Sequence, residues 1–225
     1  QDTAVTLLVD CSGSMRYSKL QLAAHAAYAL SQTLERVGIA HEILGFTTNE
    51  TKVDNHRMME DIGKEQDALG RPFSRFSPIT MYVFKAFDER LNVVTRRRLI
   101  GAAGSSEGRG SPDYFPHQVA TRANVDGESV MLAALRLLKR REQRKVMIVL
   151  SDGEPAAYGI EHHLAEHLQK TVQVIEKMGV EAVGIEIRDE SVKAFYKKAV
   201  VIEDIDTLPA AVMGEIKRFL IDKRP

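Results

Sequence analysis

Cysteine is nearly absent from this 225-residue sequence, which contains only Cys11. A single thiol excludes an internal disulfide and fits a reducing compartment such as the cytosol. An excess of charge of either sign is also absent, because 31 Lys and Arg residues balance 31 Asp and Glu residues. A net charge of zero provides no global field that would attract nucleic acid or an anionic membrane. We therefore expect neither partner.

Long apolar runs and targeting patterns are missing as well. No run approaches the roughly 20 residues that span a bilayer, and the amino terminus has no signal-peptide pattern. These absences favour a soluble, cytoplasmic protein. The sequence begins at Gln1 instead of a methionine, which suggests the C-terminal part of a longer protein.

Two functional motifs do not occur. The phosphate-binding pattern G-x-x-x-x-G-K-[ST] is absent, so we do not expect the chain to have an ATPase site of its own. His163 and His167 stand four residues apart, as do His162 and Glu166, but the H-E-x-x-H order of zinc hydrolases is missing. A second metal site on this segment is therefore not expected.

The sequence does contain a regular alternation of short β-branched runs with longer amphipathic segments. This alternation is typical of an α/β fold with a doubly wound, mostly parallel sheet flanked by helices. Six strands are predicted, although a helix fits the third nearly as well: Ala4–Val9, His41–Phe46, Met81–Phe87, Lys145–Leu150, Glu181–Ile187 and Ala199–Ile202. Four helices are predicted: Lys19–Val37, Ser129–Arg141, Glu161–Met178 and Leu208–Ile221.

We interpret residues 1–225 as one domain with two interruptions. Residues 47–78 are polar and poor in β-branched side chains, so we expect an excursion from the sheet. Residues 101–126 begin with many Gly, Ser and Pro residues, which predicts a flexible loop.

The stretch VDCSGSM lies at the end of the first predicted strand. Asp10, Ser12 and Ser14 alternate along it, so their oxygens can converge on one point, and Gly13 lets the backbone bend around that point. Carboxylate and hydroxyl oxygens suit Mg²⁺, Mn²⁺ or Ca²⁺ better than a softer metal such as zinc. The alternative is a helix cap, which needs one of these three residues and leaves two unexplained.

A second acidic loop, SDGEP, follows the predicted strand Lys145–Leu150. If the first and fourth strands are neighbours, their carboxyl-end loops meet and Asp152 faces Asp10. Two facing carboxylates repel, so the pKa of one would rise unless a cation lay between them. A simple turn at Asp152-Gly153 is the alternative interpretation.

These residues carry a resemblance to a known family. DCSGS resembles the D-x-S-x-S signature of the metal-ion-dependent adhesion site (MIDAS) of von Willebrand factor A (VWA) domains, and SDG resembles the aspartate-glycine that follows their fourth strand. The chain is most similar to the C-terminal A-type domain of the T subunit of the aerobic cobaltochelatase. Besides VDCSGSM, the similarity covers Leu34–Thr48, Val125–Ser129, Leu137–Pro155 and Ala199–Leu208.

The resemblance implies a Rossmann-like VWA fold and a magnesium site. Its ligands would be Asp10, Ser12, Ser14 and Asp152. The second loop of VWA domains usually supplies a threonine, which is missing from the segment Asn124–Ser129. Asp126, Glu128 or Ser129 could take its place, and an acidic residue there would favour metal affinity over capture of a partner's carboxylate.

The resemblance also implies a function. The chain would be a non-catalytic part of an ATP-driven complex that inserts cobalt into a corrin ring, with a AAA+ ATPase subunit and a large chelatase subunit as partners. Its cation would connect the domain to the ATPase and couple ATPase motion to chelation. The alternative is a stand-alone scaffold domain that binds a protein through the same metal. A hydrolase is disfavoured because no His or Glu general base lies in the motifs.

Three other groups of residues have simpler interpretations. The basic stretches at 96–98, 139–141 and 144–145 fit a solvated helix face better than a surface that binds a phosphate or an acidic partner. Cys11 fits a buried small residue, because no base to activate it is identifiable. Several aromatic residues fit the core or its cover better than a tetrapyrrole pocket: Phe73, Phe76, Tyr82, Phe84 and Phe87.

Overall fold

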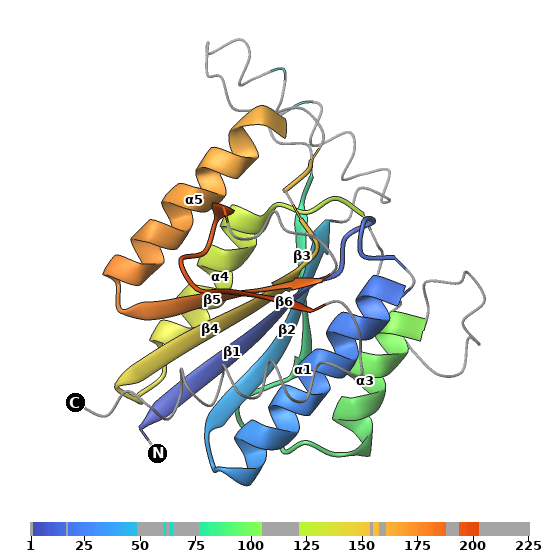
Figure 1. Ribbon diagram of the computed structural model, residues 1–225, viewed down its shortest axis with the longest axis vertical. Coiled ribbons are helices and arrows are strands. Elements are labelled where there is room, and N and C mark those ends of the chain that lie inside the picture. Colours follow the sequence, from blue (N-terminus) through green and yellow to red (C-terminus); the bar gives the residue numbers. More distant parts are fainter. Residues whose placement is uncertain are drawn as a thin grey trace.

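A computed structural model describes residues 2–16, 18–48, 61, 64, 77–104, 122–153, 155–157, 161–187 and 194–202. In this part of the chain, six strands form one sheet in the order β3-β2-β1-β4-β5-β6 (Figure 1). The strands are β1 (Thr3–Asp10), β2 (Ala40–Thr48), β3 (Ile79–Lys85), β4 (Arg144–Ser151), β5 (Val180–Ile187) and β6 (Ala199–Ile202).

Helices cover both faces of the sheet. They are α1 (Ser18–Arg36), α3 (Val93–Gly104), α4 (Asp126–Leu138) and α5 (Glu161–Lys177). Helices α1 and α3 pack on one face, and α4 and α5 pack on the other (Figure 1). Each face has its own apolar core, so the residues of β1 are buried along its whole length. Burial on both faces explains why β1 is mostly apolar instead of alternating between apolar and polar residues.

The strand order places the ends of β1 and β4 side by side. Both pair in parallel, with Val9 opposite Leu150, while β2 pairs with the other edge of β1. The connections after β1 and after β4 therefore lead to opposite faces, the point at which α/β sheets bind ligands. The predicted α/β fold with a mostly parallel, doubly wound sheet is confirmed. β3 is the exception, because it runs antiparallel to β2 at the sheet edge.

Several predicted boundaries differ from the structure. Helix α4 begins at Asp126, three residues before the predicted Ser129, with Val125 as an N-cap that makes no side-chain capping bond. Helix α3 was not predicted, and residues 101–104, expected in the flexible loop, form its end. The predicted helix Leu208–Ile221 lies outside the described residues, as do nearly all of the excursion after residue 48 and residues 105–121 of the loop.

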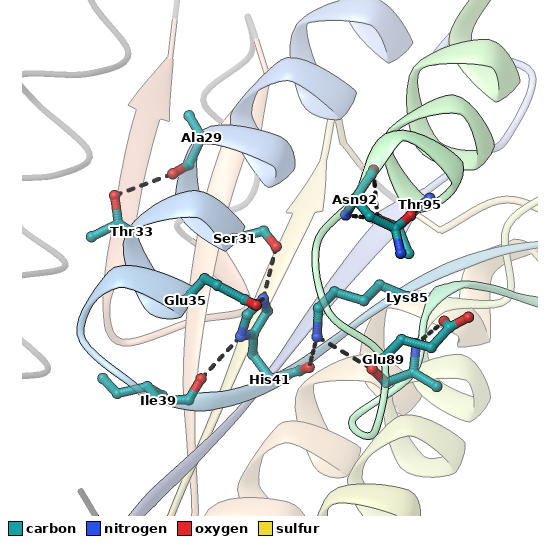
Figure 2. Close-up of polar contacts among 11 residues, drawn as sticks. Ala29, Ser31, Thr33, Glu35, Ile39, His41, Lys85, Glu89, Asn92 and Thr95 are labelled. Carbon is teal, nitrogen blue, oxygen red and sulfur yellow. Dashed lines mark hydrogen bonds and ion pairs between the residues drawn. The ribbon is translucent and has the colours of Figure 1, made fainter.

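A buried polar network fastens the amino-terminal end of β2 to its neighbours (Figure 2). His41 Nε2 lies 2.7 Å from Ser31 Oγ of α1, and its Nδ1 lies 3.0 Å from the carbonyl of Ile39. Lys85 of β3 is 2% exposed and donates to the carbonyls of His41, at 2.8 Å, and Ala86, at 3.2 Å. This network lies at the end of the sheet opposite the loops that follow β1 and β4.

No helix in the described ranges is both long and apolar enough to cross a bilayer.

Candidate metal centre

Backbone hydrogen bonds bring three distant loops together above the carboxyl ends of β1 and β4. Gly13 N donates to Arg122 O at 2.6 Å, which fastens the loop after β1 to the segment before α4. Asn124 and Ala156 exchange two backbone bonds, of 2.9 and 3.1 Å, which fasten that segment to the loop after β4. Thr48 Oγ1, at the end of β2, accepts a bond from Ala123 N at 3.0 Å.

Asp10 is the last residue of β1 and is fully buried. Its Oδ1 accepts a hydrogen bond of 2.8 Å from Ser12 N, and its Oδ2 accepts one of 3.0 Å from Ser151 Oγ. The hydroxyls of Ser12 and Ser14 lie 3.0 Å apart. Ser12 is buried and Ser14 is exposed, so this pair of residues extends from the interior to the surface of the protein.

Asp152 faces this loop from the end of β4. Its Oδ1 accepts a hydrogen bond of 2.8 Å from Ser14 Oγ, and its Oδ2 lies 2.5 Å from Lys19 Nζ. The structure therefore brings together Asp10, Ser12, Ser14 and Asp152, which the sequence places up to 142 positions apart.

Asp126 contributes a third buried carboxylate from the first turn of α4. It is 2% exposed, and its Oδ2 has no hydrogen-bond partner in the described part of the chain. Burial, and then the charge of Asp10, raise the pKa of Asp126 well above its usual value. Burial, with a contribution from the charge of Asp152, raises the pKa of Asp10 to about 6. Among the described residues, no positive charge is one of the main causes acting on either pKa.

The other two candidates from the second loop are placed differently. Ser129 Oγ donates to the carbonyl of Val125 at 2.8 Å, within the same helical turn. Glu128 is half-buried, and the charges that shift the pKa values of Asp10 and Asp126 do not include that of Glu128. Of the three candidates left open by the sequence, Asp126 is the one that adjoins Asp10.

The donor set fits a hard divalent cation. It combines carboxylates with serine hydroxyls and includes a buried oxygen, Asp126 Oδ2, without a hydrogen-bond partner in the described residues. Within the described ranges, no three His, Cys, Asp or Glu side chains group closely enough to hold a metal ion by themselves. A cation bound here would therefore depend on the hydroxyls of Ser12 and Ser14 as well as on the carboxylates.

Sequence reasoning assigned no role in this region to four residues. Ser151 holds Asp10, and Lys19 pairs with Asp152. Glu186 of β5 is fully buried and stands opposite Ser151 in register. Tyr196 is buried, and its hydroxyl has no partner in the described chain. The available signals were a serine beside Asp152 and a lysine in the first turn of a helix; nothing local marked Glu186 or Tyr196.

Cys11 and two of the aromatic residues belong to the core. Cys11 is fully buried, so the prediction of a buried small residue is confirmed, and burial raises the pKa of its thiol. Tyr82 and Phe84 stack with centroids 6.1 Å apart against the α1 side of the sheet. Phe87 lies under the guanidinium of Arg140 at 4.7 Å. Phe73 and Phe76 are outside the described residues.

Several of the basic side chains are paired. Arg98 contacts Glu89 at 2.8 Å, Arg140 contacts Glu142 at 2.6 Å, and Arg144 contacts Glu181 at 2.7 Å. Arg96 lies over the ring of Tyr28 at 5.5 Å. These contacts agree with solvated helix and strand surfaces rather than a phosphate site.

The side chains of His163 and His167 of α5 are described. Within the described residues, neither belongs to a group of three or more His, Cys, Asp or Glu side chains that could hold a metal ion. The His167 ring packs against Gly127, where an added Cβ would lie 2.2 Å from His167 Nδ1. His163 is exposed, and the side chain of His162 is not described.

Comparison with known proteins identifies a family and shows similarity to a distant relative. The family model described as the Cobalamin biosynthesis protein CobT VWA domain matches residues 1–222. The uncharacterized protein YojO of Bacillus subtilis (strain 168) is 24% identical over 231 residues, which cover 97% of this chain and 30% of YojO. The chain therefore spans less than a third of the length of that relative.

Solved structures show the same fold at low identity. The pilus adhesin SpaC of Lactobacillus rhamnosus GG is 12% identical, with a TM-score of 0.59 over 98% of this chain and 31% of SpaC. The PilB minor pilin of Streptococcus sanguinis is 12% identical, with a TM-score of 0.56 over 99% of this chain and 63% of PilB. Proximal thread matrix protein 1 of the mussel byssus, solved with a zinc-occupied MIDAS motif, is 10% identical, with a TM-score of 0.50 over 95% of this chain and 46% of that one.

Proposed function

Because the chain belongs to the CobT VWA domain family, which places it in the context of cobalamin biosynthesis, we propose that it is the metal-dependent interaction domain of a cobaltochelatase-like complex. In this proposal the domain is cytoplasmic and non-catalytic. It couples a AAA+ ATPase subunit to a large chelatase subunit that inserts cobalt, the cargo of the reaction, into a corrin ring.

The observation that carries the proposal is the meeting of Asp10, Ser12, Ser14 and Asp152 at the switch point of the sheet. These are the positions that match the MIDAS signature of the family. The buried, unpartnered oxygen of Asp126 and the raised pKa of Asp10 support a cation between them, because a cation would give that oxygen a partner and would offset the burial of the negative charge. The zinc-occupied MIDAS of the mussel protein is a further support for a divalent metal.

We propose Mg²⁺ as the resident cation, with Mn²⁺ or Ca²⁺ as substitutes that the same hard oxygens accept. Its ligands would be drawn from Asp10, Ser12, Ser14, Asp152 and Asp126. When bound, the cation would neutralise the carboxylates and offer a coordination position to a carboxylate of the partner.

The chain's own groups hold this arrangement in place. Ser12 N and Ser151 Oγ fix both oxygens of Asp10, so the carboxylate keeps one orientation. Ser14 bridges the loops after β1 and β4 through Asp152. The exposed position of Ser14 gives a partner access to the site, whereas Asp10 and Asp126 are shielded from water.

A thermal melt tests the metal site. We expect Mg²⁺ at about 100 times its Kd to stabilise the wild type by about 2.7 kcal/mol, and this gain should vanish in Asp10→Asn, which keeps the shape of the side chain. Asp88→Asn removes an exposed carboxylate just after β3 and should respond as the wild type does. Absence of stabilisation of the wild type by Mg²⁺, Mn²⁺ and Ca²⁺ would contradict the metal site.

Co-purification tests the partner. A purified AAA+ subunit of a cobaltochelatase should be retained by the wild type in Mg²⁺ and released by EDTA, and Ser12→Ala/Ser14→Ala should not retain it. Retention by that double variant would show that the cation is not the bridge. Metal binding without retention of any AAA+ subunit would favour the stand-alone scaffold instead.

A further inference from the structure

The ammonium group of Lys19 contacts Asp152, one of the carboxylates proposed to bind the cation. Its Nζ lies 2.5 Å from Asp152 Oδ2, while Asp152 Oδ1 is held by Ser14. The side chain of Asp152 is 4% exposed and that of Lys19 is 32% exposed. The carboxylate is thus shielded from water, whereas the ammonium lies close enough to the surface to move into solvent.

Helix energetics do not account for a lysine at this position. Lys19 is the second residue of α1, in a first turn that contains no acidic residue. The amino-terminal end of a helix carries partial positive charge, so a cation in the first turn is unfavourable. The contact with Asp152 offsets that cost.

The buried carboxylates of the candidate metal centre are unfavourable when no positive charge lies near them. Asp10, Asp126 and Asp152 are all at least 95% buried, and Ser12 and Ser14 link Asp10 to Asp152 through hydrogen bonds, so these carboxylates repel one another when ionised. An ammonium beside Asp152 offsets part of this repulsion. A divalent cation at the same carboxylate would repel that ammonium strongly, because the two would lie a few ångströms apart in a poorly solvated site.

We propose that Lys19 is a tethered counter-ion that holds Asp152 while the site lacks metal and leaves Asp152 when a divalent cation binds. Lys19 therefore stabilises the metal-free protein and lowers its affinity for the cation. This inference rests on the proposed metal site and identifies a residue that sets its affinity.

The test is calorimetric titration of the 225-residue chain with MgCl₂ and with MnCl₂. Lys19→Met keeps the aliphatic stem and removes the charge, and we expect it to bind both cations about tenfold more tightly than the wild type, the scale of one charge-assisted hydrogen bond. Lys170→Met is the matched control, because Lys170 also forms a 2.5 Å ion pair, with Glu166, but on the exposed surface of α5. This control should bind as the wild type does.

A second measurement separates a counter-ion from a merely structural lysine. In EDTA, Lys19→Met should melt below the wild type, and in saturating Mg²⁺ the difference should disappear, because the cation then replaces the ammonium. A structural role would lower the melting temperature equally in both conditions.

The outcomes distinguish this inference from the proposed function. If the wild type binds a cation and Lys19→Met binds it equally or more weakly, the inference about Lys19 is wrong and the metal site stands. If neither protein binds Mg²⁺ or Mn²⁺, the metal site itself is wrong, and the inference fails with it. If Lys19→Met binds the cation more tightly than the wild type and Lys170→Met does not, the metal site and the inference about Lys19 are both supported.

Discussion

At the scale of single residues, Asp126 is poorly accommodated in the metal-free protein. Its carboxylate is buried near Asp10 and Asp152, with one oxygen lacking a hydrogen-bond partner in the described chain. Such a group is destabilising by itself, because burial and like charges both disfavour its ionised form. A residue retained under that penalty is expected to serve binding rather than stability.

Asp126→Asn should therefore separate stability from metal affinity. Without metal, we expect the variant to have a higher free energy of unfolding than the wild type, because the neutral amide removes a buried charge that the charge of Asp10 disfavours. Its stabilisation by Mg²⁺ should fall. Urea unfolding with and without MgCl₂ measures both effects, and a less stable metal-free variant would contradict the argument.

Gly45 of β2 illustrates a steric constraint on the core. A Cβ at this position would lie 2.5 Å from Phe84 Cε2 and 2.9 Å from Cys11 Sγ, both in the core on the α1 side. We predict that Gly45→Ala lowers the free energy of unfolding by about 1–3 kcal/mol through overpacking. Circular-dichroism melts would show the loss, and adding Phe84→Leu should recover part of it.

At the scale of elements, α4 and α5 meet through Gly127 and His167. A methyl group on Gly127 would lie 2.2 Å from His167 Nδ1 and 2.8 Å from its Cε1. The glycine thus explains the close packing of the two helices at this point.

The sign of the effect of Gly127→Ala should depend on residue 167. In the wild type we expect a loss of about 1–3 kcal/mol from the steric conflict. In a His167→Ala background the conflict is gone, and the higher helix propensity of alanine should stabilise by up to about 1 kcal/mol. A double-mutant cycle of urea unfolding measures the sign, and equal losses in both backgrounds would rule out the contact as the cause.

At the scale of the whole molecule, two polar regions lie at opposite ends of the sheet. The candidate metal centre lies at the carboxyl ends of β1 and β4. The network of His41 and Lys85, drawn in Figure 2, lies at the opposite end of these strands, where β2 begins. Burial lowers the pKa of Lys85, and it lowers the pKa of His41 to about 4, with the nearby Lys85 charge adding to the effect and Glu35 opposing it.

His41 should make the whole fold less stable in acid. Its folded pKa of about 4 lies below the unfolded value of 6.5, so the unfolded chain binds more protons between these values. The stability that the neutral ring contributes is complete above about pH 6.5 and is lost as pH falls toward 4. Between about pH 7.5 and about pH 5, we expect this one group to remove about 2 kcal/mol.

The variant His41→Asn isolates this contribution. It should be less stable than the wild type near neutral pH, because the contacts with Ser31 and Ile39 are altered, but the difference should shrink by about 2 kcal/mol as the pH falls to about 5. Urea unfolding at several pH values measures it. A difference that stays constant with pH would mean that His41 does not titrate as described.

The sequence by itself determined most of the elements and the identity of the motif residues. The buried strand β1, helix α1 and the stretch from Asp10 to Ser14 all follow from local properties, namely apolar periodicity and the alternation of short polar side chains. Such properties depend on neighbours a few residues apart, so no tertiary contact is needed to recognise them. The mostly parallel sheet followed from the same alternation.

Only the tertiary structure decided which of these residues meet and which groups support them. It placed β3 antiparallel at an edge and put Asp126 where the charge of Asp10 acts on it. It also brought Ser151, 141 positions away in sequence, onto the carboxylate of Asp10. Lys19 belongs to the same class, because its partner Asp152 lies 133 positions away. Contacts of this kind depend on strand order and on the close packing of helices over the sheet, and a sequence pattern that spans a few residues carries neither.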